Sequence, residues 1–143
     1  MRIVGTLSIG FLLVAGVTMA QAPESSQPVG TMADVMVGMT YPAANEILLS
    51  VARGGPASDK EWMMVQRSAV LLGESGNVLM MRGRLRDQGE WLKDARMMVD
   101  AGAAAYKAAR ARDTAALAAV TEPLNASCST CHTQYRLNVH PLR

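Results

Sequence analysis

Residues 58–82 of the chain read SDKEWMMVQRSAVLLGESGNVLMMR. They open with a helix start signal, because Ser58 can cap an N-terminus and Glu61 follows it three residues later. The apolar side chains that follow recur at the spacing of one helix face, which comprises Trp62, Val65, Ala69, Leu72 and Leu79. This period predicts a long amphipathic helix that buries one stripe against other helices.

Similar start signals occur on both sides of this stretch. They are the pairs Thr31 with Asp34 and Asp87 with Glu90, and the single N-cap candidate Asp113. Glycine-containing turns separate the first three segments. The expected helices span residues 31–53, 58–82, 87–112 and 113–136. Four amphipathic helices joined by short connections predict an all-α fold, an antiparallel four-helix bundle.

The other three helices carry apolar stripes of the same kind. The stripes comprise Met32, Met36, Met39, Ala43 and Ile47 in the first helix, Leu92, Ala95, Val99, Gly102 and Tyr106 in the third, and Leu117, Val120, Leu124 and Cys128 in the fourth. Pro42 and Pro123 lie inside the first and fourth helices, where a missing N–H predicts a kink or a break. The third and fourth helices are rich in alanine, so they either pack very closely or enclose something large and flat.

The composition narrows the class of protein. A chain of 143 residues that is 50% hydrophobic supports one domain with a substantial core. Its formal net charge of +2 argues against nucleic-acid binding, which calls for a concentrated basic face. No nucleophile with an adjacent base, no paired carboxylates and no phosphate-binding loop can be discerned, so we do not expect an enzyme.

The first twenty residues have the pattern of a signal peptide. Arg2 supplies the positive charge, an apolar run follows, and small residues allow cleavage after Ala20, with cleavage after Ala22 as the alternative. The apolar run is shorter than the ~20 residues of a membrane span, so we expect export to the periplasm and no stable membrane span. Residues 21–30 are expected to form a flexible leader, and residues 137–143 a C-terminal tail.

The residues that carry chemistry are Cys128-Ser129-Thr130-Cys131-His132. Cys-x-x-Cys-His is the attachment signal for c-type haem. On a helix, two cysteines three residues apart share one face, so both sulfurs can form thioethers with the vinyl groups of one haem. His132 follows directly and can serve as the proximal iron ligand. Attachment would also account for an exported thiol pair, which would otherwise be oxidised.

Three other interpretations of the motif are weaker. A thioredoxin-like redox motif requires a βαβ setting, which this helical pattern lacks. A zinc site would need His140 beside Cys128, Cys131 and His132, and that spacing suits a tetrahedral ion poorly. A disulfide between cysteines three residues apart in a helix has poor geometry. It would leave a haem-free helical binding module.

Cys128 to Arg136 follow the pattern Cys-x-x-Cys-His-x-x-Tyr-Arg, close to the C-terminus of an exported four-helix chain. This arrangement resembles the cytochrome c-prime family, the class II c-type cytochromes. The resemblance implies a left-handed bundle over residues 31–136 with one haem c near one end. It implies redox partner proteins and allows a homodimer. By the motif, Cys128 and Cys131 hold the haem and His132 is its axial ligand. Arg136, one turn further on, would lie by the proximal face, although a solvated arginine at a helix end is at least as common.

The sixth iron ligand would decide the function. In the family the distal residue comes from the first helix, which here offers Met32, Met36 and Met39 on one face. We favour Met36 for its central position, with Met39 and Met32 as alternatives. Methionine ligation predicts an electron carrier between redox partners, whereas an open iron predicts binding of nitric oxide or carbon monoxide. Flexible core filler is the structural alternative for all three methionines.

The remaining polar and aromatic features have structural explanations. Arg82, Arg84 and Arg86 form a basic turn that could steer an acidic redox partner or meet a haem propionate, although a solvated loop is the commoner case. Trp62 and Trp91 are expected to pack helices together. His140, in the tail, is expected to be a surface histidine.

Overall fold

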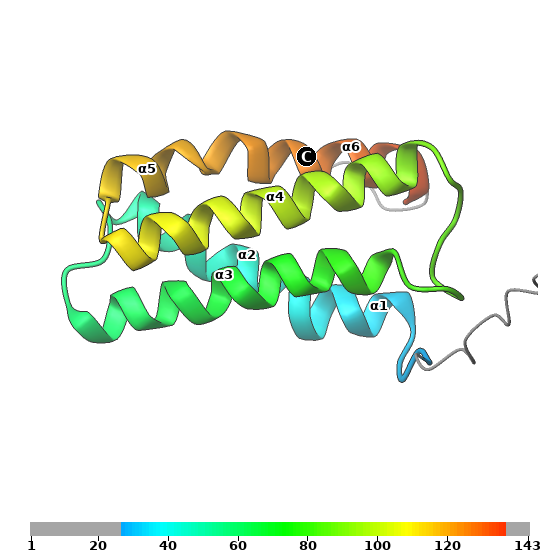
Figure 1. Ribbon diagram of the computed structural model, residues 1–143, viewed down its shortest axis with the longest axis horizontal. Helices are drawn as coiled ribbons and strands as arrows, with labels where there is room; N and C mark the ends of the chain where they lie inside the picture. The colour runs from blue at the N-terminus through cyan, green and yellow to red at the C-terminus, as the bar shows by residue number, and fades with distance from the viewer. Residues whose placement is uncertain (1–26, 137–143) are drawn as a thin grey trace, which may run out of the picture.

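The computed structural model describes residues 27–136, and over that range the chain folds into helices without a strand. Figure 1 shows the helical segments running back and forth along the long axis, each reversing the direction of the one before. The prediction of an all-α fold is confirmed, and the arrangement is compatible with a helical bundle. The expected signal peptide over residues 1–20 and the tail with His140 lie outside the described residues.

The first helical segment contains a distortion caused by Pro42. It consists of α1 (Met32–Val35), a π-helix η1 (Met36–Thr40) and α2 (Tyr41–Ala52). Pro42 has no N–H to donate, and the turn before it widens so that the Tyr41 N–H bonds the carbonyl of Met36, five residues back. The kink expected at Pro42 therefore takes the form of a π-turn.

The length and composition of this first segment also qualify it as a candidate membrane span. Its mean hydropathy is 1.2, and 33% of the most apolar window is buried inside the protein. The core helix of a globular domain passes the same test.

Helix α3 (Asp59–Leu79) follows its prediction closely. Ser58 caps it and accepts a hydrogen bond from the Glu61 N–H at 3.3 Å, while the Glu61 carboxylate accepts one from the Ser58 N–H at 3.1 Å. All five residues of the predicted apolar stripe are buried. The helix ends at Leu79, three residues before the predicted end at residue 82. The chain turns there through Gly83, whose φ of +86° favours glycine.

Helix α4 (Glu90–Ala111) departs from its prediction in its cap and its buried face. Gly89 is the N-cap, and Asp87 acts from outside the helix by accepting hydrogen bonds from the N–H groups of Gly89 and Trp91 at 2.8 and 3.2 Å. The predicted stripe was wrong in part, because Tyr106 is exposed and Leu92 and Val99 are only half-buried. The face that packs inward is Trp91, Asp94, Ala95, Met98, Ala101, Gly102, Ala105, Ala108 and Ala109. Small side chains are buried here because α4 lies close to α3.

The fourth predicted helix is two helices, α5 (Thr114–Ala119) and α6 (Thr121–Tyr135), with a break at Val120. Pro123 lies in the first turn of α6, where backbone N–H groups have no partner within the helix, so the missing N–H of proline is tolerated there. A new helix begins just before Pro123, so the break expected from this proline is confirmed. The Asp113 carboxylate caps α5 and accepts from the Ala116 N–H at 2.9 Å.

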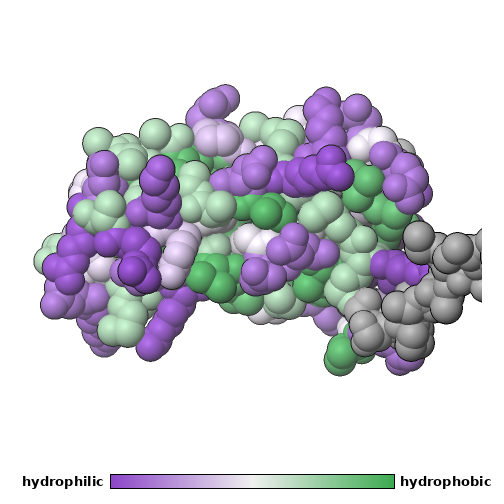
Figure 2. Space-filling view, in the orientation of Figure 1, coloured by the Kyte–Doolittle hydropathy of each residue, from purple (hydrophilic) through white to green (hydrophobic). Residues whose placement is uncertain are grey.

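Helices α3 and α4 pack backbone against backbone. A Cβ added to Gly102 would lie 2.5 Å from the Gly73 nitrogen, and one added to Gly76 would lie 3.0 Å from the Ala95 carbonyl oxygen. The alanine-rich face of α4 therefore packs very closely against α3 at this contact. Close packing was one of the two explanations for the alanine content, the other being that the helices enclose something large and flat. Figure 2 shows hydrophilic residues spread over the visible face, with hydrophobic patches between them.

Candidate functional site

The Cys-x-x-Cys-His motif lies in the last turns of α6, which packs mainly against α4 and ends at the right of Figure 1. Cys131 is 9% exposed, while Cys128 and His132 are half-buried. Both cysteines are free thiols. Cys128 and Cys131 share a helix face that is partly covered by protein, with His132 one residue beyond.

Both thiols are held in their neutral form. Burial, followed by the charge of Asp94 and the influence of Cys128, raises the pKa of Cys131 to about 11. Burial also raises the pKa of Cys128, against a smaller lowering effect of a contact with the Ser127 hydroxyl. Redox catalysis of the thioredoxin type relies on a thiolate of depressed pKa, so the environment here disfavours that interpretation.

His132 is held in the form that binds metals. Burial lowers its pKa below the ordinary value, and the Arg136 guanidinium lowers it further. Arg136 itself is exposed at the end of α6, where its N–H bonds the His132 carbonyl oxygen at 3.0 Å. A neutral imidazole keeps a nitrogen lone pair available for coordination.

Asp94 is a buried acid beside the motif that the sequence did not point to. It is 2% exposed, and its Oδ1 accepts a hydrogen bond from the Thr130 hydroxyl at 3.1 Å. Its Oδ2 is buried and has no hydrogen-bond partner in the described part of the chain. The signal that could have found it is an aspartate one turn after Trp91, on the face of α4 that packs inward.

Tyr135 fastens the end of α6 to the start of α4. Its hydroxyl donates to Asp87, and its ring meets the Trp91 ring edge-on at 4.9 Å between centroids. Trp91 in turn donates from Nε1 to the Leu79 carbonyl oxygen at 2.8 Å. Packing is the role expected for Trp91, and these contacts confirm it. They hold the ends of α3, α4 and α6 together next to the motif.

The candidate distal residues lie at the same end of the molecule. In Figure 1, α1 and the end of α6 both lie toward the right. Met32, Met36 and Met39 are half-buried and pack against the core, and Met36 opens the π-turn. Thr40, in the same turn, is buried, and its hydroxyl oxygen has no hydrogen-bond partner among residues 27–136. Outside its own helical segment, the turn that holds Met36 packs mainly against α3.

A haem is a chemically reasonable occupant of this end of the chain. Two free thiols on one face would anchor it, and His132 and a methionine sulfur are ligands suited to its iron. Among the described residues, the buried Nε of Arg84 and the buried hydroxyl of Thr40 have no hydrogen-bond partner, and burying such a group unsatisfied is energetically costly. Between residues 27 and 136, no three His, Cys, Asp or Glu side chains converge to hold a bare metal ion. His140 lies outside that range.

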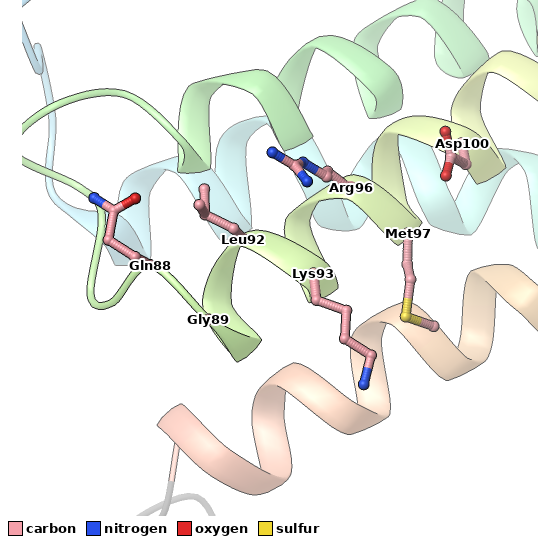
Figure 3. A pocket seen from close by; sticks show the side chains of 7 residues that line it. All are labelled: Gln88, Gly89, Leu92, Lys93, Arg96, Met97 and Asp100. Carbon is pink, nitrogen blue, oxygen red and sulfur yellow. The ribbon is translucent and has the colours of Figure 1, made fainter.

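A cavity of about 350 Å³ lies along the first half of α4, and none of the motif residues lines it. Figure 3 shows the side chains that line it, Gln88, Gly89, Leu92, Lys93, Arg96, Met97 and Asp100. The Lys93 Nζ forms an ion pair with the Glu90 Oε2 at 3.1 Å. The lining contains neither cysteine nor histidine, so this cavity adds no ligand to the Cys-x-x-Cys-His motif.

Comparisons with known protein families, with curated proteins and with solved structures found no match to this chain.

Proposed function

We propose that the chain is an exported c-type cytochrome that carries one covalently bound haem and shuttles electrons between redox partner proteins. The observation that carries the proposal is the pair of free, partly buried cysteines on one face of α6, with His132 as the next residue in the chain. The fold of such a protein is an antiparallel four-helix bundle, like that of the cytochrome c-prime family.

In this proposal each residue of the motif has a defined task. Cys128 and Cys131 hold the haem through thioethers, and His132 binds the iron from the proximal side. Arg136 places a positive charge one turn away, which favours the neutral imidazole. The haem supplies reversible one-electron chemistry, and the chain's residues fix its position and cover it from water.

Met36 is the proposed distal ligand. It lies on the first helix at the same end as the motif, half-buried, in a π-turn of the kind found at functional sites. A His/Met pair raises the potential of the iron and suits an electron carrier better than an enzyme. The alternatives are Met39, Met32 or an open iron that binds nitric oxide or carbon monoxide.

The signal peptide pattern places the proposed protein in the periplasm, where haem attachment accounts for an exported thiol pair. There its partners would be redox proteins rather than nucleic acids. A homodimer is compatible with the exposed apolar side chains Met63, Met64, Val70 and Leu71 on α3.

Visible absorption of the purified protein tests the proposal. The ferric and dithionite-reduced spectra are recorded before and after addition of carbon monoxide, for the wild type and for Met36→Ala. We expect sharp, split ferrous bands that carbon monoxide leaves unchanged in the wild type. Met36→Ala should open the iron, so that the bands broaden and shift with the gas.

Met63→Ala is the matched control, because Met63 lies on α3 and its side chain is 45% exposed. This substitution should leave every spectrum unchanged. A wild-type spectrum that shifts with carbon monoxide would reject Met36 as ligand and favour gas binding. A colourless protein from a host with haem-attachment machinery would refute the cytochrome itself.

A further inference from the structure

Arg84 is a buried cation without an ionic partner in the structure. It is 7% exposed, in the connection between α3 and α4. Its Nη2 donates to the Gly30 carbonyl oxygen at 2.9 Å, and its Nε is buried with no hydrogen-bond partner in the described part of the chain. No ion pair to Arg84 occurs within residues 27–136. A buried, unpaired charge is strongly unfavourable, so this guanidinium calls for an anion.

The acid that influences Arg84 does not fill this role. Asp34 lies near enough for Arg84 to lower its pKa, but this is the weakest of the four causes acting on that carboxyl. The Asp34 Oδ2 accepts from both the backbone N–H and the hydroxyl of Thr31, at 2.8 and 2.6 Å. Asp34 thus serves the capping box of α1, and the Nε of Arg84 stays unsatisfied.

Arg84 borders a cavity of about 280 Å³ that is formed by residues at the start of α1 and in the connection between α3 and α4. Figure 1 shows this connection and the end of α6 at the same end of the molecule. The cavity is also lined by Pro28, Gly30, Met32, Leu85 and Arg86. Met32 and Leu85 are half-buried and pack against the core, and Met32 belongs to the same stripe as Met36. One wall is therefore apolar and another cationic, which matches a carboxylate carried on an apolar body better than a hydrated free anion.

We propose that Arg84 binds a propionate carboxylate of the haem, with Nε as one of its donors. The inference rests on the proposed function and assigns it a binding residue outside the Cys-x-x-Cys-His motif. An arginine can meet a carboxylate through two N–H groups, so the pair would satisfy the orphaned donor and the buried charge together.

Infrared difference spectroscopy of the haem-loaded protein tests this assignment. Haem labelled with carbon-13 at its propionate carboxyl carbons identifies the propionate bands in the reduced-minus-oxidised spectrum. We expect a propionate band to shift in Arg84→Gln, and to shift less in Arg84→Lys, which keeps the charge. Arg96→Gln is the matched control, since Arg96 is exposed on α4 and lines the other cavity (Figure 3). It removes the same charge and should leave the bands in place.

The outcomes separate this assignment from the proposed function. Unaltered propionate bands in a coloured Arg84→Gln protein would overturn the Arg84 assignment alone. If Arg84→Gln does not fold, an unaltered band in Arg84→Lys would overturn it equally. A wild-type protein without haem would overturn both. Stabilisation of the coloured wild type by inorganic phosphate, absent from Arg84→Lys at equal ionic strength, would show that the cavity takes a free anion instead.

Discussion

Gly102→Ala should destabilise the protein, even though alanine is the better helix former. The added Cβ would lie 2.5 Å from the nitrogen and 2.7 Å from the Cα of Gly73, and 3.0 Å from the Ala69 carbonyl oxygen. All three are backbone atoms of α3, so no side chain can rotate away. The closest of these distances is roughly 1 Å short of an ordinary contact, and the two helices must separate.

The expected size follows from two opposed terms. Replacing glycine by alanine inside a helix contributes about 1 kcal/mol in favour of folding. Overpacking a tight interior contact costs about 1–3 kcal/mol, and rigid backbone on both sides places this site toward the upper end. The net expectation is a loss of about 1–2 kcal/mol, or a fall of about 4–8 °C in Tm.

Gly73→Ala is the matched control on the opposite helix. Its Cβ would meet the Val99 carbonyl oxygen at 3.7 Å and the Gly102 Cα at 3.9 Å, which are ordinary contacts. It should therefore stabilise the protein by about 0.5–1 kcal/mol through helix propensity alone. Urea unfolding followed by far-UV circular dichroism measures both variants. Equal stabilisation by the two substitutions would refute the close approach of α3 and α4.

Two further predictions concern hydrogen bonds at helix ends. The hydrogen bond to Asp87 raises the pKa of Tyr135 to about 12, so the stability that this pair contributes is present below pH 10 and lost as pH rises toward 12. Ultraviolet titration of Asp87→Asn should show one more tyrosine ionised at pH 11 than in the wild type, and an unchanged titration would contradict the contact. Asp113→Ala removes the cap of α5 at the Ala116 N–H and should cost about 1 kcal/mol in urea unfolding, with Asp113→Asn retaining most of it.

The sequence anticipated the local structure where one residue's own chemistry decides it. Ser58 with Glu61, Thr31 with Asp34, and Asp113 each cap the helix they were expected to cap. Pro42 and Pro123 distort the chain where their missing N–H groups predict. These features depend on neighbours within about one turn, so they can be read along the chain.

Of the candidate site, the sequence predicted only the residues that lie close together along the chain. The motif itself identifies Cys128, Cys131 and His132, because their spacing places them on one helix whatever surrounds it. Asp94 went unnoticed, since its burial and its bond to Thr130 depend on how α4 meets α6. The orphaned donor of Arg84 was equally invisible, because the sequence shows a basic turn but not which arginine is buried.

The sequence by itself determined that this protein is helical, where most of its helices begin, and which five residues form the Cys-x-x-Cys-His motif. Each of these follows from hydrogen bonding and periodicity within a single segment. Only the tertiary structure decided which face of α4 is buried. Glycine and alanine pack inward there together with Trp91, Asp94 and Met98, whereas Leu92 and Val99 are half-buried and Tyr106 is exposed. That choice depends on the gap between two helices, and a gap of backbone width accepts only the smallest side chains.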